Sequence, residues 1–331
     1  MTWLKLACVK IFIMITPPKQ LAPKKLVIAS RESALAMWQA LHIQAKLRSL
    51  YPHCDVQILG MTTTGDQILD SPLSLIGGKG LFVKELEVAL ENGSADLAVH
   101  SMKDVPMNLP AGFAMAATGE REDARDAFVS NSFDSLESLP QSSIVGTSSL
   151  RRQSQIQARF PHLKIESLRG NVQTRLRKLD EGQYAAIILA AAGLIRLGLG
   201  DRIRNFISPH DSIPAVGQGA LGIEIRADRT DLMEVLAPLN HIDTQLCVEA
   251  ERGFSRALAG SCTVPLGAYA LRDGDNINMT GFVASVDGKQ ILRETITGLA
   301  GNADAVGRAL AAKLVARGAD KILAELDHVK H

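Results

Sequence analysis

The stretch SSIVGTSSLRRQSQIQARF, residues 142–160, joins an apolar strand pattern directly to a helical pattern. Its first eight residues predict a buried strand, and the rest predict a helix from the spacing of their apolar positions. Thr147, Ser148 and Ser149 stand at the junction, where hydroxyl groups can bond the free N–H groups of a first helical turn. A strand that passes straight into a helix is the repeating unit of α/β folds.

The same alternation of strand and helix patterns extends in both directions from this stretch. Residues 25–30 and 95–100 are apolar runs that each predict a buried strand. Further strands are predicted at 55–61, at 163–170 and within 184–198, and helices at 32–50, 77–93, 150–160 and 171–182. Strands that alternate with helices imply a mostly parallel sheet with both faces covered, and therefore an α/β fold.

Two or three domains are expected, because 331 residues are long for a single domain, and the patterns along the chain divide into three regions. Residues 215–228 predict a strand that could return to the first domain. After His241, a helix is followed by alternating apolar positions and Asp-Gly turns, which are typical of antiparallel strands. The expected divisions are a disordered N-terminal extension at 1–24, a first α/β domain at 25–119 and 219–238, a second α/β domain at 124–213, and a small α+β domain with an antiparallel sheet at 241–331.

The first residues carry an apolar stretch from Trp3 to Ile15 that Lys5 and Lys10 interrupt. This stretch is too short to span a bilayer, and it lacks the unbroken apolar core and small-residue cleavage site of a signal peptide. The Pro-rich segment that follows favours a poorly ordered extension. A secretory role and a translation start at Met14 are the open alternatives.

Composition disfavours several classes of function. The net charge of +1 predicts no polyanion partner, and the 4% aromatic content weighs against stacking platforms for nucleic acid bases. The four cysteines, Cys8, Cys54, Cys247 and Cys262, form no C-x-x-C pair and no cluster with the spacing of a metal site, so no metal is expected. So few thiols favour a reducing compartment, which we take to be the cytoplasm, over a disulfide framework.

Arginines gather at three strand-to-helix junctions, together with residues that can cap a helix. They are Arg31, Arg151, Arg152, Arg169 and Arg175, accompanied by Ser33, Thr147, Ser148, Ser149 and Asn171 as the predicted cap of its helix. A cation in a first helical turn opposes the helix dipole and is unfavourable there unless an anion binds. Guanidinium forks and free N–H groups at the carboxyl ends of parallel strands would line one cleft. The sequence therefore predicts a site for several carboxylates or phosphates, with solvated helix faces as the alternative at any single junction.

Lys103 and Asp104 are adjacent after the apolar strand at 95–100, just before a proline that prevents its continuation. A lone carboxylate in a cationic cleft could stabilise a cationic intermediate or relay protons. A surface ion pair in a turn is the alternative. The Gly-rich segment GGKGLFVKELE, residues 77–87, lacks the spacing of a nucleotide P-loop and predicts a lid.

Cys262 lies in the short turn LAGSCTVPLG, residues 258–267, after a helix that ends at Gly260. Cys54 and Cys247 have apolar or helical surroundings that indicate packing roles. An accessible thiol among small residues can instead form a stable thioether with an electrophilic carbon. An oxidisable bystander is the alternative for Cys262 on these local features.

Several longer motifs together resemble one known family. They are GGKGLFVKELE, DLAVHSMKDVP, EREDARDAFVS, IVGTSSLRRQ, LRGNVQTRL, AAIILAAAGL, PAVGQGALGIE and GSCTVPLGAYA. In this length and order they resemble the porphobilinogen deaminase family, also called hydroxymethylbilane synthases, from about Lys25 to the last helix. Only the N-terminal extension falls outside the resemblance.

The resemblance implies two similar α/β domains like those of type II periplasmic binding proteins, an active-site cleft between them, and a small third domain. It implies a transferase of tetrapyrrole and haem biosynthesis that deaminates four porphobilinogen molecules and joins them head to tail into 1-hydroxymethylbilane, with release of ammonia. It also implies a dipyrromethane cofactor, bound by a thioether to Cys262 and kept as a primer. A monomer without nucleic acid or membrane partners is expected.

The resemblance also assigns roles to residues of this sequence. Asp104 matches the catalytic aspartate of the family. Cofactor-binding residues are implied at Cys262, Lys103, Asp104, Thr147, Ser148, Ser149, Arg151, Arg152, Arg169 and Gly170. Substrate-binding residues are implied at Arg31, Ser33, Gln39, Arg175, Arg196 and Gln218, and lid residues at Lys79 and Phe82. Leu75 departs from the family, in which a lysine is expected at that position.

Other classes of protein can share this two-lobed pattern or a lone lysine. A solute-binding protein for an anionic ligand would have a signal peptide or lipid anchor and no special thiol, so the interrupted N-terminus and Cys262 argue against it. A DNA-binding regulator would have a helix-turn-helix segment and a basic face, and neither is visible in the sequence. A pyridoxal phosphate or metal enzyme is disfavoured, because no metal-ligand cluster is visible and carboxylate binding explains Lys103 better.

Overall fold

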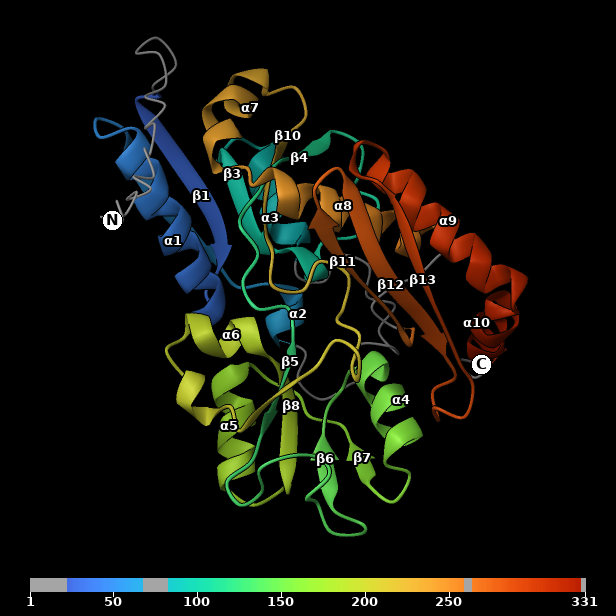
Figure 1. Ribbon diagram of the computed structural model, residues 1–331. Coiled ribbons are helices and arrows are strands. Elements are labelled where there is room, and N and C mark those ends of the chain that lie inside the picture. Colours follow the sequence, from blue (N-terminus) through green and yellow to red (C-terminus); the bar gives the residue numbers. More distant parts are fainter. Residues whose placement is uncertain (1–22, 68–82, 259–263, 329–331) are drawn as a thin grey trace, which may run out of the picture.

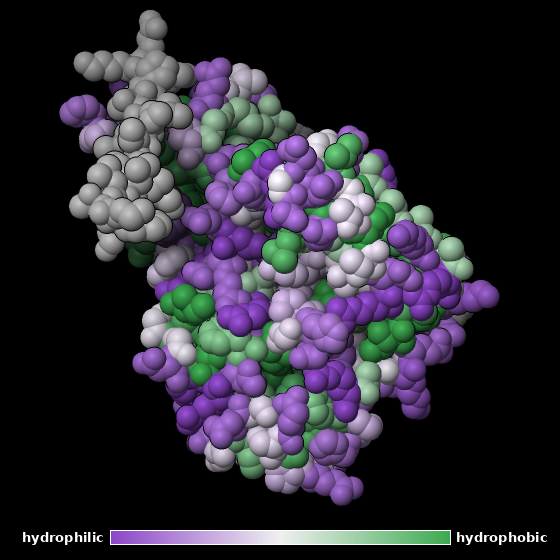
Figure 2. All heavy atoms as spheres, in the orientation of Figure 1, coloured by the Kyte–Doolittle hydropathy of each residue, from purple (hydrophilic) through white to green (hydrophobic). Residues whose placement is uncertain are grey.

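The computed structural model describes residues 23–67, 83–258 and 264–328 (Figure 1). Two sheets of five strands and one sheet of three strands organise these residues. The first sheet lies at the top of Figure 1, the second at the bottom, and the third, in orange and red, at the right. Figure 2 shows hydrophilic and hydrophobic side chains interspersed over this face. The expected α/β architecture with an antiparallel C-terminal sheet is confirmed, while the domain limits stay a prediction.

The first sheet has the strand order β2-β1-β3-β10-β4. Its strands are β1 (Lys25–Arg31), β2 (Asp55–Met61), β3 (Leu97–Ser101), β4 (Phe113–Thr118) and β10 (Leu221–Arg226). Strands β2, β1 and β3 are parallel, whereas β10 runs antiparallel to both of its neighbours, β3 and β4. The strand predicted within residues 215–228 therefore does return to the first sheet.

Helices cover both faces of this sheet, which explains the continuous apolar run of β1. The helices are α1 (Ala34–Leu50), α3 (Lys84–Glu91) and α7 (Thr230–Leu236). Leu26 and Ile28 pack with residues of α1 and α7 on one face, and Ala29 packs with residues of α3 on the other. A strand that is buried on both faces has no side for alternating polar residues.

The second sheet repeats this arrangement, with the strand order β7-β6-β8-β5-β9. Its elements are β5 (Asp126–Val129), β6 (Ile144–Gly146), β7 (Lys164–Glu166), β8 (Ala186–Ala190) and β9 (Asn205–Ile207), with α4 (Leu150–Arg159), α5 (Val172–Asp180) and α6 (Ala191–Arg196). Strands β7, β6 and β8 are parallel, and β5 runs antiparallel to β8 and β9. On one face of the sheet, Ile156 of α4 and Phe160 directly after α4 fill the core. On the other face, Leu176 and Leu179 of α5 fill it.

The third sheet is antiparallel and packs against long helices. Its elements are β11 (Leu266–Asp273), β12 (Asn276–Ala284) and β13 (Ile291–Leu299), with α8 (Ile242–Ala257), α9 (Ala303–Ala316) and α10 (Ala319–His328). Ala268 and Met279 of the sheet share a core with Phe254 of α8 and Leu310 of α9. Shorter helical segments of the chain are α2 (Thr64–Gln67), η2 (Met102–Asp104), η3 (Gly200–Arg202), η4 (Ala237–Leu239) and η5 (Ala300–Asn302).

The chain crosses between the first two sheets twice, at residues 119–125 and 208–220. The two crossing segments bond to each other, because the N–H of Glu122 donates to the carbonyl of Gly219. Gly219 has a φ of +89°, and a Cβ there would overlap the carbonyl oxygen of Glu122, so this position requires glycine. The Nε of Arg121 also donates to the carbonyl of Gln218 at 2.8 Å.

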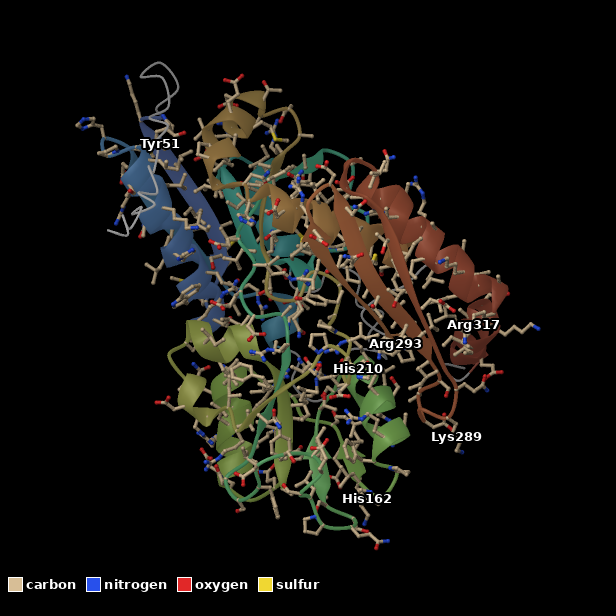
Figure 3. All side chains as sticks on the ribbon, viewed as in Figure 1. Tyr51, His162, His210, Lys289, Arg293 and Arg317 are labelled. Atoms are coloured by element: carbon tan, nitrogen blue, oxygen red, sulfur yellow. The ribbon has the colours of Figure 1, made fainter. Side chains whose placement is uncertain are left out.

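The third sheet and its helices form a third domain, and the first and second sheets with their helices form two lobes. The third domain contacts both lobes. Glu251 of α8 is fully buried, and its carboxylate accepts from the Arg121 guanidinium at 2.6 Å and from the N–H of Gly217 at 2.7 Å. Toward the second lobe, Arg293 of β13 donates to the carbonyl oxygen of His210 at 2.6 Å, and Figure 3 labels both residues. These contacts connect the third domain to the segments that cross between the lobes.

Helices α8 and α9 approach each other closely at Gly307. A Cβ on Gly307 would overlap the carbonyl oxygen of Ala250 and would lie 2.6 Å from the backbone nitrogen of Phe254. The two backbones can pack at this distance only because Gly307 has no side chain.

We expect Gly307→Ala to lower the free energy of unfolding by about 1–3 kcal/mol, because α8 and α9 must separate and open the core to admit the methyl group. Gly301→Ala is the matched control, since a Cβ on Gly301 meets nothing within 4 Å. Urea unfolding of both variants provides the measurement. Equal stability of the two variants would contradict the close approach of the helices.

Candidate active site

The carboxyl ends of β1 and β3 place several predicted residues at one edge of the first sheet. These strands are parallel neighbours, so Arg31 and Ser101 end them at the same edge. Gln39 of α1 is buried, and its side-chain amide donates to the Ser101 hydroxyl at 2.8 Å. The chain then turns through η2, where Lys103 is half-buried and Asp104 is exposed.

The parallel strands β6 and β7 end at an edge of the second sheet that carries the other predicted residues. Thr147 is buried directly after β6, and the Ser148 hydroxyl donates to the carbonyl of Leu168, which follows β7, at 2.8 Å. Asn171 caps α5 by accepting a hydrogen bond from the N–H of Thr174 at 2.9 Å. The cap predicted from the sequence is confirmed.

Ser33 and Ser149 are the N-cap residues of α1 and α4, but neither side chain makes a capping hydrogen bond within the described residues. Neither helix has an acidic residue in its first turn. The first-turn N–H groups of a helix attract anions, all the more when no side chain caps them. Both helix ends are therefore suited to a bound carboxylate.

Gly170 determines how the chain turns between β7 and α5. Its φ is +106°, and a Cβ there would lie 2.6 Å from the Cγ2 atom of Thr174, so only glycine fits. The turn presents the carbonyl of Gly170 to Arg175, whose Nε donates to it at 2.8 Å. This hydrogen bond fixes the Arg175 guanidinium at the start of α5.

Four cations from the two lobes lie close enough to influence one another. They are Lys103, Arg152, Arg169 and Arg175, here called the cation cluster. Burial lowers the pKa of Lys103, and Asp104 opposes that shift. Burial and the neighbouring Arg152 lower the pKa of Arg175 to about 10. The Nη1 of Arg169 is buried without a hydrogen-bond partner among the described residues, so this part of the site favours an added anion.

Arg151 and Arg152 both bind one buried carboxylate, that of Asp126 at the start of β5. Arg151 reaches its two oxygens at 2.8 and 3.0 Å, and Arg152 contacts Oδ1 at 2.8 and 3.0 Å. Ser212 and Gln218 donate to the same carboxylate at 2.8 and 3.0 Å. Although burial alone raises the pKa of Asp126, the two guanidinium groups hold it well below its ordinary value.

Asp126 is a residue that the sequence analysis did not single out. The anion expected beside the first turn of α4 is supplied to Arg151 and Arg152 from within the protein. The motif EREDARDAFVS could have predicted a buried ion pair at Asp126. This residue begins the apolar run DAFV, and a carboxylate on a buried strand needs a cationic partner. The sequence could not predict which cations pair with Asp126, because β5 and α4 meet only in the folded sheet.

Arg196 and Gln218 lie at the crossing between the lobes. Arg196 is 9% exposed, its Nη2 donates to the carbonyl of Gly219 at 2.7 Å, and its guanidinium lies 5.7 Å from the ring centre of Trp38. Gln218 is 1% exposed, and its amide donates to the carbonyl of Ala124 at 2.6 Å. Both side chains bond the crossing segments, and their roles toward substrate stay predictions.

Several positions discussed above lie outside the described residues: Leu75, Lys79, Phe82, Cys262 and residues 1–22. Cys54 and Cys247 are described, and both are buried in apolar clusters, in agreement with their predicted packing roles. Burial raises the pKa of Cys54 above its ordinary value, and burial with Glu251 raises the pKa of Cys247 to about 11. Both thiols are therefore poor nucleophiles at neutral pH.

Two matches together span most of the chain. Residues 26–234 match the family described as "Porphobilinogen deaminase, dipyromethane cofactor binding domain", and residues 245–316 match "Porphobilinogen deaminase, C-terminal domain". The chain belongs to the porphobilinogen deaminase family. It is 75% identical to a porphobilinogen deaminase of Methylobacillus flagellatus over 307 residues, which cover 93% of this chain and 99% of that one. It is 63% identical to one of Chromobacterium violaceum over 300 residues, which cover 91% and 97%.

The structure is also similar to the periplasmic aliphatic sulphonate binding protein SsuA from Escherichia coli. The TM-score is 0.41 at 14% identity, and the match covers 72% of this chain and 71% of that one. A likeness of this degree carries no conclusion about a ligand. Within the described residues, no helix combines the length and the apolar character needed to cross a membrane.

The donors of the site fit a dipyrromethane cofactor of the kind that the family description names. Such a group carries several carboxylates. The Nη1 of Arg169, which has no partner among the described residues, and the buried guanidinium of Arg175 both favour an added carboxylate. The uncapped N-terminus of α4 at Ser149 adds N–H groups nearby in sequence to Arg151 and Arg152. Residues at this edge of the second sheet are thus suited to hold the group.

We expect Asp126→Asn to lower the free energy of unfolding by about 3–5 kcal/mol, because Arg151 and Arg152 would keep buried charges without a carboxylate. Asp123→Asn is the control, since Asp123 pairs with the half-exposed Arg125 and such a pair is worth about 0–1 kcal/mol. Denaturant unfolding of both variants compares the losses. A loss from Asp126→Asn as small as that from the control would show that the buried pair is not needed.

Proposed function

We propose that the protein deaminates four molecules of porphobilinogen and joins them head to tail into 1-hydroxymethylbilane, with release of ammonia. It belongs to a family of enzymes, and we assign it to the transferases of tetrapyrrole and haem biosynthesis. The cation cluster carries this proposal, because each porphobilinogen brings an acetate and a propionate and each extension adds two carboxylates. We further propose that the enzyme acts as a monomer in the cytoplasm.

Substrate binding is proposed to rest on guanidinium groups at the edges of the first two sheets. Arg169 and Arg175 offer guanidinium forks that suit carboxylates, and neither forms an ion pair within 4 Å among the described residues. Arg31 adds a third guanidinium at the edge of the first sheet. Cations from both lobes would therefore face a chain that grows by two carboxylates at each step.

Arg151 and Arg152 have a different role in this proposal. Their guanidinium groups already bind Asp126, and Arg151 also donates to the carbonyl of Ile213 at 2.7 Å. They hold α4 against β5 and add positive potential at this edge of the second sheet. Loss of either arginine would leave the buried carboxylate with one of its two guanidinium partners, so assembly of the cofactor should suffer before catalysis.

Asp104 is proposed to act on the reacting pyrroles. It is exposed on η2, next to Lys103 and within the electrostatic reach of Arg175. Positive charge develops on the substrate pyrrole as ammonia leaves. A carboxylate can stabilise that charge, accept hydrogen bonds from pyrrole N–H groups, and receive the α-proton after the new carbon–carbon bond has formed.

Cys262 is proposed to hold the dipyrromethane through a thioether at its sulfur. When bound, the dipyrromethane supplies the terminal pyrrole to which the first substrate is joined. Arg169 and the N-terminus of α4 at Ser149 would hold its carboxylates, and Asp104 would face its pyrrole N–H groups. The two other cysteines that the structure describes are buried, and neither competes for this role.

We expect Asp104→Asn to retain the cofactor mass and to turn over porphobilinogen at least about a hundredfold more slowly, because an amide neither carries charge nor accepts a proton. Asp201→Asn, an exposed aspartate of η3, is the matched control and should keep normal turnover. Ammonia release and product absorbance from purified protein provide the rate. Near-normal turnover of Asp104→Asn would remove Asp104 from the mechanism.

A further inference from the structure

A cavity of about 430 Å³ lies between the first and third domains. Its walls come from β4, from the segment that follows η2, and from one face of α8. It shares no lining residue with the cation cluster. Its volume falls in the range of sites that hold small organic molecules.

Arg252 of α8 brings a positive charge to this cavity. Its guanidinium donates to the carbonyl oxygens of Val105, Pro106 and Met107 at 3.3, 2.5 and 3.1 Å. Among the described residues, no carboxylate oxygen lies within 4 Å of a guanidinium nitrogen of Arg252, so Arg252 forms no ion pair there. Burial and the neighbouring Arg256 lower the pKa of Arg252 to about 10, so the group is still charged at neutral pH. A partly buried cation with only neutral acceptors gains from an added anion.

Arg252 also keeps a donor available, since its Nε makes no hydrogen bond within the described part of the chain. The other arginine of the cavity differs, because Arg256 is paired with Asp304 at 2.5 Å. Asp304 also pairs with Arg308, so within the described residues Arg252 is the arginine of the cavity lining that has no carboxylate partner. The cavity thus offers one cation for a ligand carboxylate. It is suited to one carboxylate and not to a molecule with several.

The apolar part of the wall is rich in methionine. Met102 is buried, Met107 and Met115 are half-buried, and all three line the cavity beside Val248. Thioether sulfurs make favourable contacts with aromatic rings, and flexible methionine side chains adapt to the outline of a flat ligand. A planar aromatic body fits this wall better than a polar one.

The geometry points to a second, non-catalytic binding site in this cavity for a planar aromatic monocarboxylate, with the ligand carboxylate at Arg252 and its ring against Met107 and Met115. Glu249, exposed on the same face of α8, disfavours additional negative charge. The polycarboxylate substrate and product of the proposed reaction should therefore bind this site more weakly than a monocarboxylate. The inference does not depend on the proposed function, because none of the cation cluster takes part.

The test uses purified enzyme with its native cofactor content, labelled with ¹³C at the methyl groups of its nine methionines. The probes are 2-naphthoate and its neutral isostere 2-naphthamide. We expect naphthoate to shift the methyl signals of Met102, Met107 and Met115 saturably, with a Kd on the order of 1 mM or tighter. Met→Leu substitutions assign the signals. The amide should bind more weakly, because it cannot compensate the charge of Arg252.

Two exposed positions on the cavity face of α8 allow a charge test that leaves Arg252 intact. Glu249→Lys should tighten naphthoate binding and Gln245→Glu should weaken it, each by about threefold, while naphthamide binding stays unchanged. Glu234→Lys on α7 makes the same charge change outside the cavity lining and is the control.

Three results would each overturn the site. The first is no saturable shift of the three cavity methyl groups up to the solubility of naphthoate. The second is equal affinity for the acid and the amide. The third is naphthoate affinity that responds to Glu234→Lys as strongly as to Glu249→Lys, since the effect would then come from total charge.

Discussion

Two buried carboxylates hold the molecule together where the chain crosses between its lobes. Asp126 of the second lobe accepts hydrogen bonds from Arg151, Arg152, Ser212 and Gln218. Glu251 of the third domain accepts hydrogen bonds from Arg121 and from the backbone of the 208–220 segment. Each carboxylate is fully buried, so it is stable there only with its full set of donors. The positions of Arg151, Arg152 and Arg121, and of the segments that cross between the lobes, depend on these two groups.

The positive charge of the site remains because the buried carboxylates pair with only some of its arginines. Asp126 binds Arg151 and Arg152, whereas Arg169 and Arg175 are left with a backbone carbonyl or no partner among the described residues. Asp104 is the carboxylate that stands exposed beside them. This balance suits a polycarboxylate ligand and leaves the exposed Asp104 beside it, which is the combination that the proposed condensation needs.

Much of the architecture could be read from the sequence, because it depends on local patterns. The apolar run of β1, the cap at Asn171 and the returning strand β10 all follow from periodicity or from cap and strand signals within a few residues. The pairing of Asp126 with α4 could not be read, because 25 residues separate Asp126 from Arg151 and only the sheet order brings them together. The same holds for Gln218 and Arg196, whose burial depends on how the two crossing segments meet. The family resemblance assigns substrate roles to Arg196 and Gln218, and these stay predictions, while the fold shows that both side chains also join the crossing segments.

The central claim is that a dipyrromethane is attached to Cys262, and the intact mass of the purified, denatured protein tests it most directly. Wild type and Cys54→Ser should both carry an excess mass equal to two linked pyrrole units, because Cys54 is a buried packing residue. Cys262→Ser should have the mass of the bare chain. An excess that persists in Cys262→Ser, or a wild-type protein that gains no adduct even after incubation with porphobilinogen, would contradict the claim.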